Sequence, residues 1–109
     1  MTVQELIDGL NLTVFHLSDT QRPVTSGYCG DLLSWVMGNA PADGAWLTIM
    51  SNVNVAAVAA LTDVSCVILT ESVTPDEPLL KKAQLQDITL LGTSQSTFEC
   101  AAALSAKLY

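Results

Sequence analysis

The second half of the chain contains three short runs of mostly apolar residues, and each run predicts a buried strand. The runs cover residues 45–50, 64–70 and 88–91. Strands that are apolar throughout and alternate with helices are typical of a parallel sheet covered on both faces. We therefore expect an α/β domain with a small, mainly parallel sheet, helices on both faces and right-handed crossovers.

Small polar residues mark where the helices beside these strands should begin. Ser51 or Asn52 is expected to cap the first of them. Ser94 or Ser96 is expected to open the last, because Glu99 stands three residues after Ser96, which is the spacing of a capping box.

A further helix is predicted between these two, over residues 74–85. Thr74 would be its cap, Pro75 its first helical residue, and Glu77 follows the cap by three residues.

The first half of the chain is less regular. A short helix is predicted over 3–9, and strands over 13–17 and 24–29. Asp31 would then cap a helix that Gly38 ends.

The composition agrees with one domain spanning residues 1–109. Of these residues 50% are hydrophobic and 14% are charged, which is enough apolar material for a packed core and too little charge for a disordered chain. The small number of charges also suggests that part of the surface is apolar and contacts a partner. A second copy of the chain is the simplest partner, so we expect a homodimer or a higher homo-oligomer.

The charge and the cysteines exclude several classes of protein. A net charge of -7 with four basic residues argues against a nucleic-acid or anionic membrane partner, because both require clustered Lys or Arg. The longest apolar stretch, 55–61, is far shorter than the roughly 20 residues that cross a bilayer. Three scattered cysteines and no secretory signal indicate a reducing, cytoplasmic location.

The sequence offers little catalytic chemistry. It has no phosphate-binding loop, no G-x-G-x-x-G motif and no metal-ligand spacing. The one histidine, His16, falls within a predicted strand, where packing or simple exposure is the commoner role. We therefore expect no cofactor, no metal and no enzymatic activity. An enzyme using Asp31 or Glu71 as a lone acid or base is the least favoured alternative.

Polar side chains follow the predicted strands, and they form the candidate ligand site. Its members are Asp31, Ser51, Asn52, Asn54, Thr70, Glu71, Thr93 and Ser94. The carboxyl ends of parallel strands meet at one edge of a sheet, where helix N-termini present free N–H groups to ligands. We call this edge the strand-exit rim.

Helix capping alone would also explain several of these residues, Asp31 among them. Asn54 is harder to explain, since Asn has poor helix propensity, and Glu71 would repel a phosphate. Lys81 and Lys82 are expected to be solvated. Trp35 is the preferred candidate for an interface anchor.

Six segments of the chain, in order, resemble the DRTGG domain family. They are Gly30–Ser34, Trp46–Ile49, Asn54–Ala59, Val67–Glu71, Pro75–Asp76 and Ser96–Glu99. The resemblance covers about residues 24–104. It implies a compact α/β fold near that of the HPr kinase N-terminal domain. It also implies a regulatory or assembly role, as in relatives within phosphotransacetylases and within CBS-containing pyrophosphatases that bind adenine nucleotides.

The motifs that define this family are only partly present. Its Asp-Arg pair aligns with Ser51-Asn52, and its Thr-Gly-Gly with Thr70-Glu71-Ser72, so only Thr70 is retained. Loss of the arginine removes the residue best suited to a phosphate. Asn54 and the Gly30-Asp31 turn are the positions that the resemblance carries over to this chain.

These observations favour two functions. The leading hypothesis is a non-catalytic regulatory domain that binds a small metabolite or an adenine nucleotide at the strand-exit rim and self-associates. The alternative is a protein-interaction or oligomerisation module without a ligand.

Overall fold

The computed structural model describes residues 1–109 and is built on a five-stranded sheet. In sheet order the strands are β1 (Thr13–His16), β5 (Leu90–Gly92), β4 (Cys66–Leu69), β3 (Gly44–Thr48) and β2 (Ser26–Cys29). The strands β2, β3, β4 and β5 run parallel, and β1 alone pairs antiparallel, with β5. The predicted α/β class with a mainly parallel sheet is confirmed.

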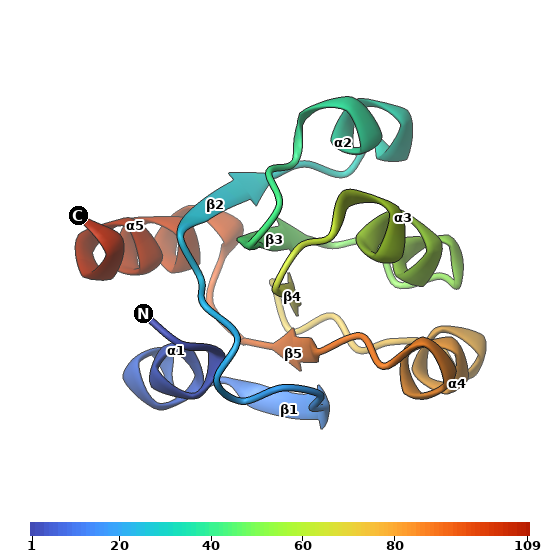
Figure 1. Cartoon of the computed structure of the whole chain (residues 1–109), viewed down its shortest axis with the longest axis horizontal. Coiled ribbons are helices and arrows are strands. Elements are labelled where there is room, and N and C mark those ends of the chain that lie inside the picture. The colour runs from blue at the N-terminus through green and yellow to red at the C-terminus, as the bar shows by residue number, and fades with distance from the viewer.

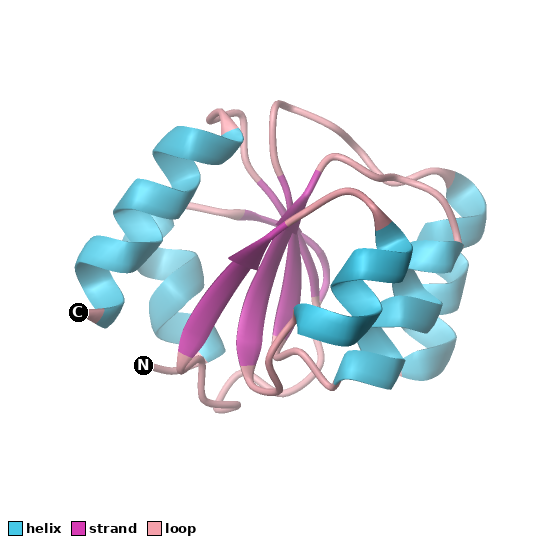
Figure 2. Ribbon diagram, turned by 90° about the horizontal axis from the view of Figure 1, so that it is seen from above, coloured by secondary structure: helices cyan, strands magenta, loops and turns pink.

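Helices cover both faces of the sheet (Figures 1 and 2). The helices are α1 (Val3–Leu10), α2 (Leu33–Asn39), α3 (Asn54–Thr62), α4 (Glu77–Gln86) and α5 (Thr97–Leu108). One face packs against α1 and α5, and the other against α2, α3 and α4. None of these helices combines the length and the apolar character that crossing a membrane would require.

The central strands are buried because both faces of the sheet are covered. Successive residues alternate between the two cores: Leu47 and Ile68 face α1 and α5, while Trp46 and Val67 face α2, α3 and α4. The fully buried indole of Trp46 donates its Nε1 hydrogen to the carbonyl oxygen of Gly30, 2.9 Å away. This bond satisfies the one polar group of the side chain.

Helix α4 begins later than predicted, at Glu77. Asp76 is its N-cap and accepts a hydrogen bond from the backbone N–H of Leu79, 2.8 Å away. The cause is Pro78. With Thr74 as the cap, Pro78 would occupy the fourth helical position, where a backbone N–H must donate to the cap carbonyl. With Asp76 as the cap, Pro78 falls in the first turn, where no N–H is needed.

The other helix starts follow the prediction to different degrees. Ser96 caps α5 as predicted and accepts a hydrogen bond from the backbone N–H of Glu99. Contrary to the prediction, neither Ser51 nor Asn52 caps α3: Val53 occupies that position without a side-chain bond. Asn52 instead accepts a hydrogen bond from the N–H of Asn54 in the turn before the helix. Asp31 does not cap α2: Leu32 occupies that position and offers no side-chain bond.

Candidate functional site

The eight predicted site residues all follow strands at the same edge of the sheet. The strands β2, β3, β4 and β5 are parallel, so the segments that leave them meet at the strand-exit rim, as expected. The rim nevertheless divides into three parts, one around Asp31, one at the start of α3, and one between the exits of β4 and β5.

The first part is organised by the carboxylate of Asp31. Its Oδ1 accepts hydrogen bonds from the hydroxyl of Thr48, at 2.8 Å, and from the backbone N–H of Ile49, at 3.0 Å. Thr48 is 1% exposed, so its hydroxyl requires a partner within the protein. Asp31 therefore joins the exit of β2 to the exit of β3 instead of capping α2.

The second part is the loop between β3 and α3. Asn52 is engaged in its turn with Asn54, and the carbonyl oxygen of Ser51 accepts a hydrogen bond from the N–H of Asp76. The side chains of Ser51 and Asn54 make no hydrogen bond within the protein, and Asn54 is exposed. Both remain available to an external group.

The third part is the tight turn Thr70-Glu71-Ser72-Val73 at the exit of β4. Glu71 and Ser72 both lie in the left-handed region, with φ of 60° and 62°, and Val73 N–H donates to Thr70 O. Two consecutive positive φ values closed by such a bond are the features of a type I′ turn, which glycine favours. The resemblance described above would place two glycines at these positions, and the backbone that glycine favours is present here with Glu71 and Ser72.

Replacing Ser72 by glycine should therefore stabilise the protein. The left-handed backbone costs a residue with a side chain about 1–2 kcal/mol. Glycine avoids this cost, but it loses more conformational entropy on folding, which offsets part of the gain. We expect the free energy of unfolding in urea to rise by about 0.5–1 kcal/mol. The matched change Ser105→Gly, at an exposed site in α5, should lower it. A decrease for Ser72→Gly would contradict the argument from strain.

The carboxylate of Glu71 fills the N-terminus of α5. Its Oε2 accepts a hydrogen bond from the backbone N–H of Thr97, 2.9 Å away, at the first residue of the helix. The hydroxyls of Thr97 and Thr70 are 2.6 Å apart. A negative group is favoured at a helix N-terminus, so the anion position of α5 is occupied by the chain itself.

The backbone N–H groups of this turn are also engaged. Glu71 N donates to Gln95 O at 2.9 Å, and Ser72 N donates to Thr93 O at 3.0 Å. The turn therefore offers no free cluster of N–H groups to a phosphate, and it is fixed to the segment that connects β5 to α5.

A hollow of about 230 Å³ lies beside this turn. Two predicted site residues, Thr93 and Ser94, line it, and the side chain of Ser94 has no hydrogen-bond partner. The sequence did not point to Thr13 and Phe15, which complete the hollow, because nothing in it indicated that β1 runs antiparallel beside β5.

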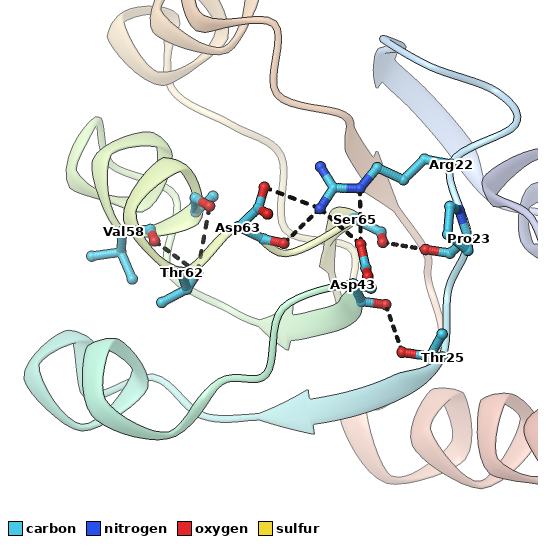
Figure 3. A network of polar contacts seen from close by, with 9 residues as sticks. Arg22, Pro23, Thr25, Asp43, Val58, Thr62, Asp63 and Ser65 are labelled. Atoms are coloured by element: carbon cyan, nitrogen blue, oxygen red, sulfur yellow. Dashed lines mark hydrogen bonds and ion pairs between the residues drawn. The ribbon is translucent and has the colours of Figure 1, made fainter.

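A larger cavity, of about 340 Å³, lies at the opposite edge of the sheet. Arg22 lines it, with its guanidinium between Asp43 and Asp63 (Figure 3). Nε and Nη2 donate to Asp43 Oδ1 at 3.2 and 3.0 Å, and Nη2 also reaches Asp63 O at 2.7 Å and Asp63 Oδ1 at 3.0 Å. Burial lowers the pKa of Arg22, but these bonds outweigh burial and raise it.

The single histidine also lies at this opposite edge. His16 Nε2 is 3.1 Å from Asp87 Oδ1, and hydrogen bonds from Ser18 and His16 lower the pKa of Asp87. His16 is therefore far from the serines and threonines of the strand-exit rim. Across the whole structure, no three His, Cys, Asp or Glu side chains are grouped so that they could hold a metal ion.

No basic side chain follows a strand at the strand-exit rim. Arg22 is held at the opposite edge, and Lys81, in the middle of α4, pairs with Glu77 at 3.2 Å. Lys82 lies next to it on α4, and Lys107 lies against Gly9 near the end of α5. A phosphate at the rim would find no opposite charge.

Comparison with known proteins places this geometry in context. The family model of the DRTGG domain matches residues 45–106, which include β3, β4, β5 and most of the rim. A search of curated proteins finds no match. Among solved structures, the fold is similar to that of the CBS and DRTGG domains of the regulatory region of Clostridium perfringens pyrophosphatase, complexed with its activator diadenosine tetraphosphate.

The structural likeness is extensive over this chain. The TM-score is 0.77 at 14% sequence identity, and the match covers 94% of this chain. It covers 45% of the pyrophosphatase fragment, so this chain spans less than half of that structure. At this identity the likeness describes the fold.

Proposed function

Because the chain belongs to the DRTGG domain family, we propose that it is a non-catalytic regulatory domain that senses a small ligand at the strand-exit rim and self-associates. We further propose that it acts in the cytoplasm, in keeping with its three free thiols. The ligand-binding group comprises Asp31, Ser51, Asn52, Asn54, Thr70, Glu71, Thr93 and Ser94.

The observation that carries the proposal is the gathering of polar groups from four strand exits at one edge. The side chains of Asp31, Asn52, Thr70, Glu71 and Thr93 make hydrogen bonds within the protein, and those of Ser51, Asn54 and Ser94 make none. A rigid edge with a few unpaired polar groups is the usual construction of a small-ligand site.

The charge of the rim favours binding through uncharged groups of the ligand. Glu71 already fills the anion position of α5, and no Lys or Arg lies nearby. The similar pyrophosphatase region binds a nucleotide activator that contains two adenosines. An adenine nucleoside is therefore our first candidate, with its hydroxyls and base contacting Asn54 and Ser94 while any phosphates extend into solvent.

Two features support a non-catalytic role. Burial raises the pKa of Cys66 to about 12 and that of Cys100 to about 11, so both thiols stay protonated at neutral pH and are poor nucleophiles. His16 pairs with Asp87 at the edge away from the rim. The histidine is therefore not placed to act as a general base for the rim hydroxyls.

Calorimetric titration with adenosine, ATP and diadenosine tetraphosphate tests the proposal. We expect adenosine to bind at least as tightly as ATP, because the rim offers nothing to the phosphates. Asn54→Ala should weaken the binding about tenfold, the usual effect of losing one hydrogen bond.

Gln84→Ala, on the exposed side of α4, is the control and should bind like the wild type. Failure of all three ligands to bind would reject an adenine nucleoside as the ligand. Unchanged affinity in Asn54→Ala would remove the rim from the site.

A second candidate function has its own supporting observation. Large apolar side chains are exposed near the rim and on α3, among them Leu32 at 67%, Trp35 at 63% and Leu61 at 68%. Exposed apolar patches mark surfaces that contact other proteins. An interaction or oligomerisation module without a ligand is therefore the alternative, and it predicts partner binding with no response to nucleosides.

A further inference from the structure

The helices α2 and α3 form a part of the surface that is almost free of charge. Residues 32–62, which include both helices, contain one charged residue, Asp43. Its carboxylate is paired with Arg22 at the edge of the sheet. In a protein with a net charge of -7, the acidic groups are therefore elsewhere.

The outward side of α3 is apolar, although the helix lies on the outside of the domain. Val55 and Val58 face the core, while Val53, Ala57 and Leu61, spaced by four residues, are exposed. A surface helix normally carries charged or polar residues on its outward side, and a helix that is apolar all round is normally buried. The outward side of α3 therefore has the composition of a buried surface.

The neighbouring helix α2 continues this surface. The two helices lie side by side (Figure 1) and pack against each other. Helix α2 exposes Trp35 at 63% and Met37 at 48%. We call the exposed residues Trp35, Met37, Val53, Ala57 and Leu61 the α2–α3 face.

The third helix of this layer, α4, is different. Its exposed positions are mainly polar and charged, with the Glu77–Lys81 ion pair among them, and Leu85 is an isolated exposed leucine at 82%. In this layer, the continuous exposed apolar surface is therefore limited to α2 and α3.

We propose that a second copy of this chain packs on the α2–α3 face about a two-fold axis, so that the same face is buried in both copies. This inference rests on the self-association in the proposed function and names its surface. In such a dimer a residue of one copy that contacts a site on the other is repeated by symmetry.

Charge and shape identify the occupant as a second copy. Two chains of net charge -7 repel each other over most of their surface, whereas the α2–α3 face itself carries no charged group. The nearby carboxylates of Asp31 and Asp63 are bonded to Thr48 and Arg22. The face also combines bulky groups, Trp35 and Leu61, with the small Ala57. Large side chains of each copy can therefore lie over small ones of the other.

Sedimentation equilibrium of the full chain and of charge variants tests the dimer. The wild type should be dimeric, and Leu61→Glu should weaken the dimer by on the order of 100-fold or more, because it buries an unpaired carboxylate in each copy. Ala57→Arg should have a similar effect from the next turn of the helix. Both positions are exposed in the single chain, so both variants should fold and melt like the wild type.

Leu85→Glu is the matched control. Leu61 and Leu85 are both exposed leucines at the next-to-last position of their helices, in α3 and α4. The same change of charge at Leu85 should leave the dimer intact.

The outcomes separate this inference from the proposed function. A dimer that survives Leu61→Glu and Ala57→Arg but is lost in Cys29→Lys, on the open edge of β2, would overturn the α2–α3 face in favour of strand pairing. Loss of the dimer in Leu85→Glu would also overturn it. A wild type that stays monomeric at its highest soluble concentration would reject self-association altogether, while the nucleoside titration would still decide the ligand part.

Discussion

Replacing Arg22 by alanine should lower the free energy of unfolding by about 1 kcal/mol, since the guanidinium makes several charged hydrogen bonds but its carboxylate partners are partly exposed to solvent. The guanidinium holds Asp43 and Asp63 together, and its side chain is only 28% exposed. Asp43 and Asp63 both have positive φ, 61° and 59°, at the turns before β3 and β4. Without Arg22, two like charges would face each other at two strained turns.

Equilibrium unfolding in urea measures this loss of stability. Two further variants, Lys81→Ala and Arg22→Lys, test whether the loss comes from the hydrogen bonds of the guanidinium. Lys81→Ala breaks the exposed pair with Glu77 and should change stability by less than about 0.5 kcal/mol. Arg22→Lys keeps the charge but not the planar donor groups, so it should fall between wild type and Arg22→Ala. Equal losses of unfolding free energy in Arg22→Ala and Lys81→Ala would show that the Arg22 contacts contribute no more to stability than an exposed ion pair.

Replacing Gly92 by alanine should lower the free energy of unfolding by about 1–3 kcal/mol, the usual cost of overpacking. A Cβ at this position would lie 2.5 Å from Phe15 Cε2 and 3.0 Å from Phe15 Cζ. The ring of Phe15 packs against the core on the side of α2, α3 and α4, so a shift away from the new Cβ would weaken its contacts with that core.

The same substitution elsewhere should have the opposite sign. At Gly38, in α2, a Cβ would meet nothing within 4 Å. Gly38→Ala should therefore raise the free energy of unfolding by about 0.5–1 kcal/mol, because alanine favours the helix. Adding Phe15→Leu to Gly92→Ala should restore part of the lost stability in a double-mutant cycle. Additive effects of the two changes would contradict a clash between these side chains.

The parallel part of the sheet was predictable because both of its faces are covered. Burial on both sides forces continuous apolar runs, such as Cys66–Leu69, and such runs are visible in the sequence without any neighbour. The family resemblance rested on an ordered series of short segments within the same region, and the match to residues 45–106 confirms it.

The direction of β1 could not be predicted in the same way. A four-residue edge strand, Thr13–His16, has exposed and half-buried residues, so its pattern does not reveal which way it runs. Thr74-Pro75 predicts the wrong start for α4, because Pro78, three residues further on, has no N–H to donate at the fourth position of a helix capped by Thr74.

The placement of the rim residues followed from the sheet, but their bonds did not. That polar side chains would meet at one edge required only parallel strands. That Asp31 would bond to Thr48, and Glu71 to Thr97, depended on contacts between segments 17 and 26 residues apart. Only the low charge of the chain and Trp35 indicated the exposed α2–α3 face in the sequence.

The carboxylate of Glu71 has a consequence for selectivity. It belongs to the same chain and accepts a hydrogen bond at the position where a free anion would sit. An incoming acidic metabolite must first displace this resident group, whereas a neutral molecule faces no such competitor. If the rim binds a ligand as proposed, Glu71 would therefore compete with acidic groups at the N-terminus of α5.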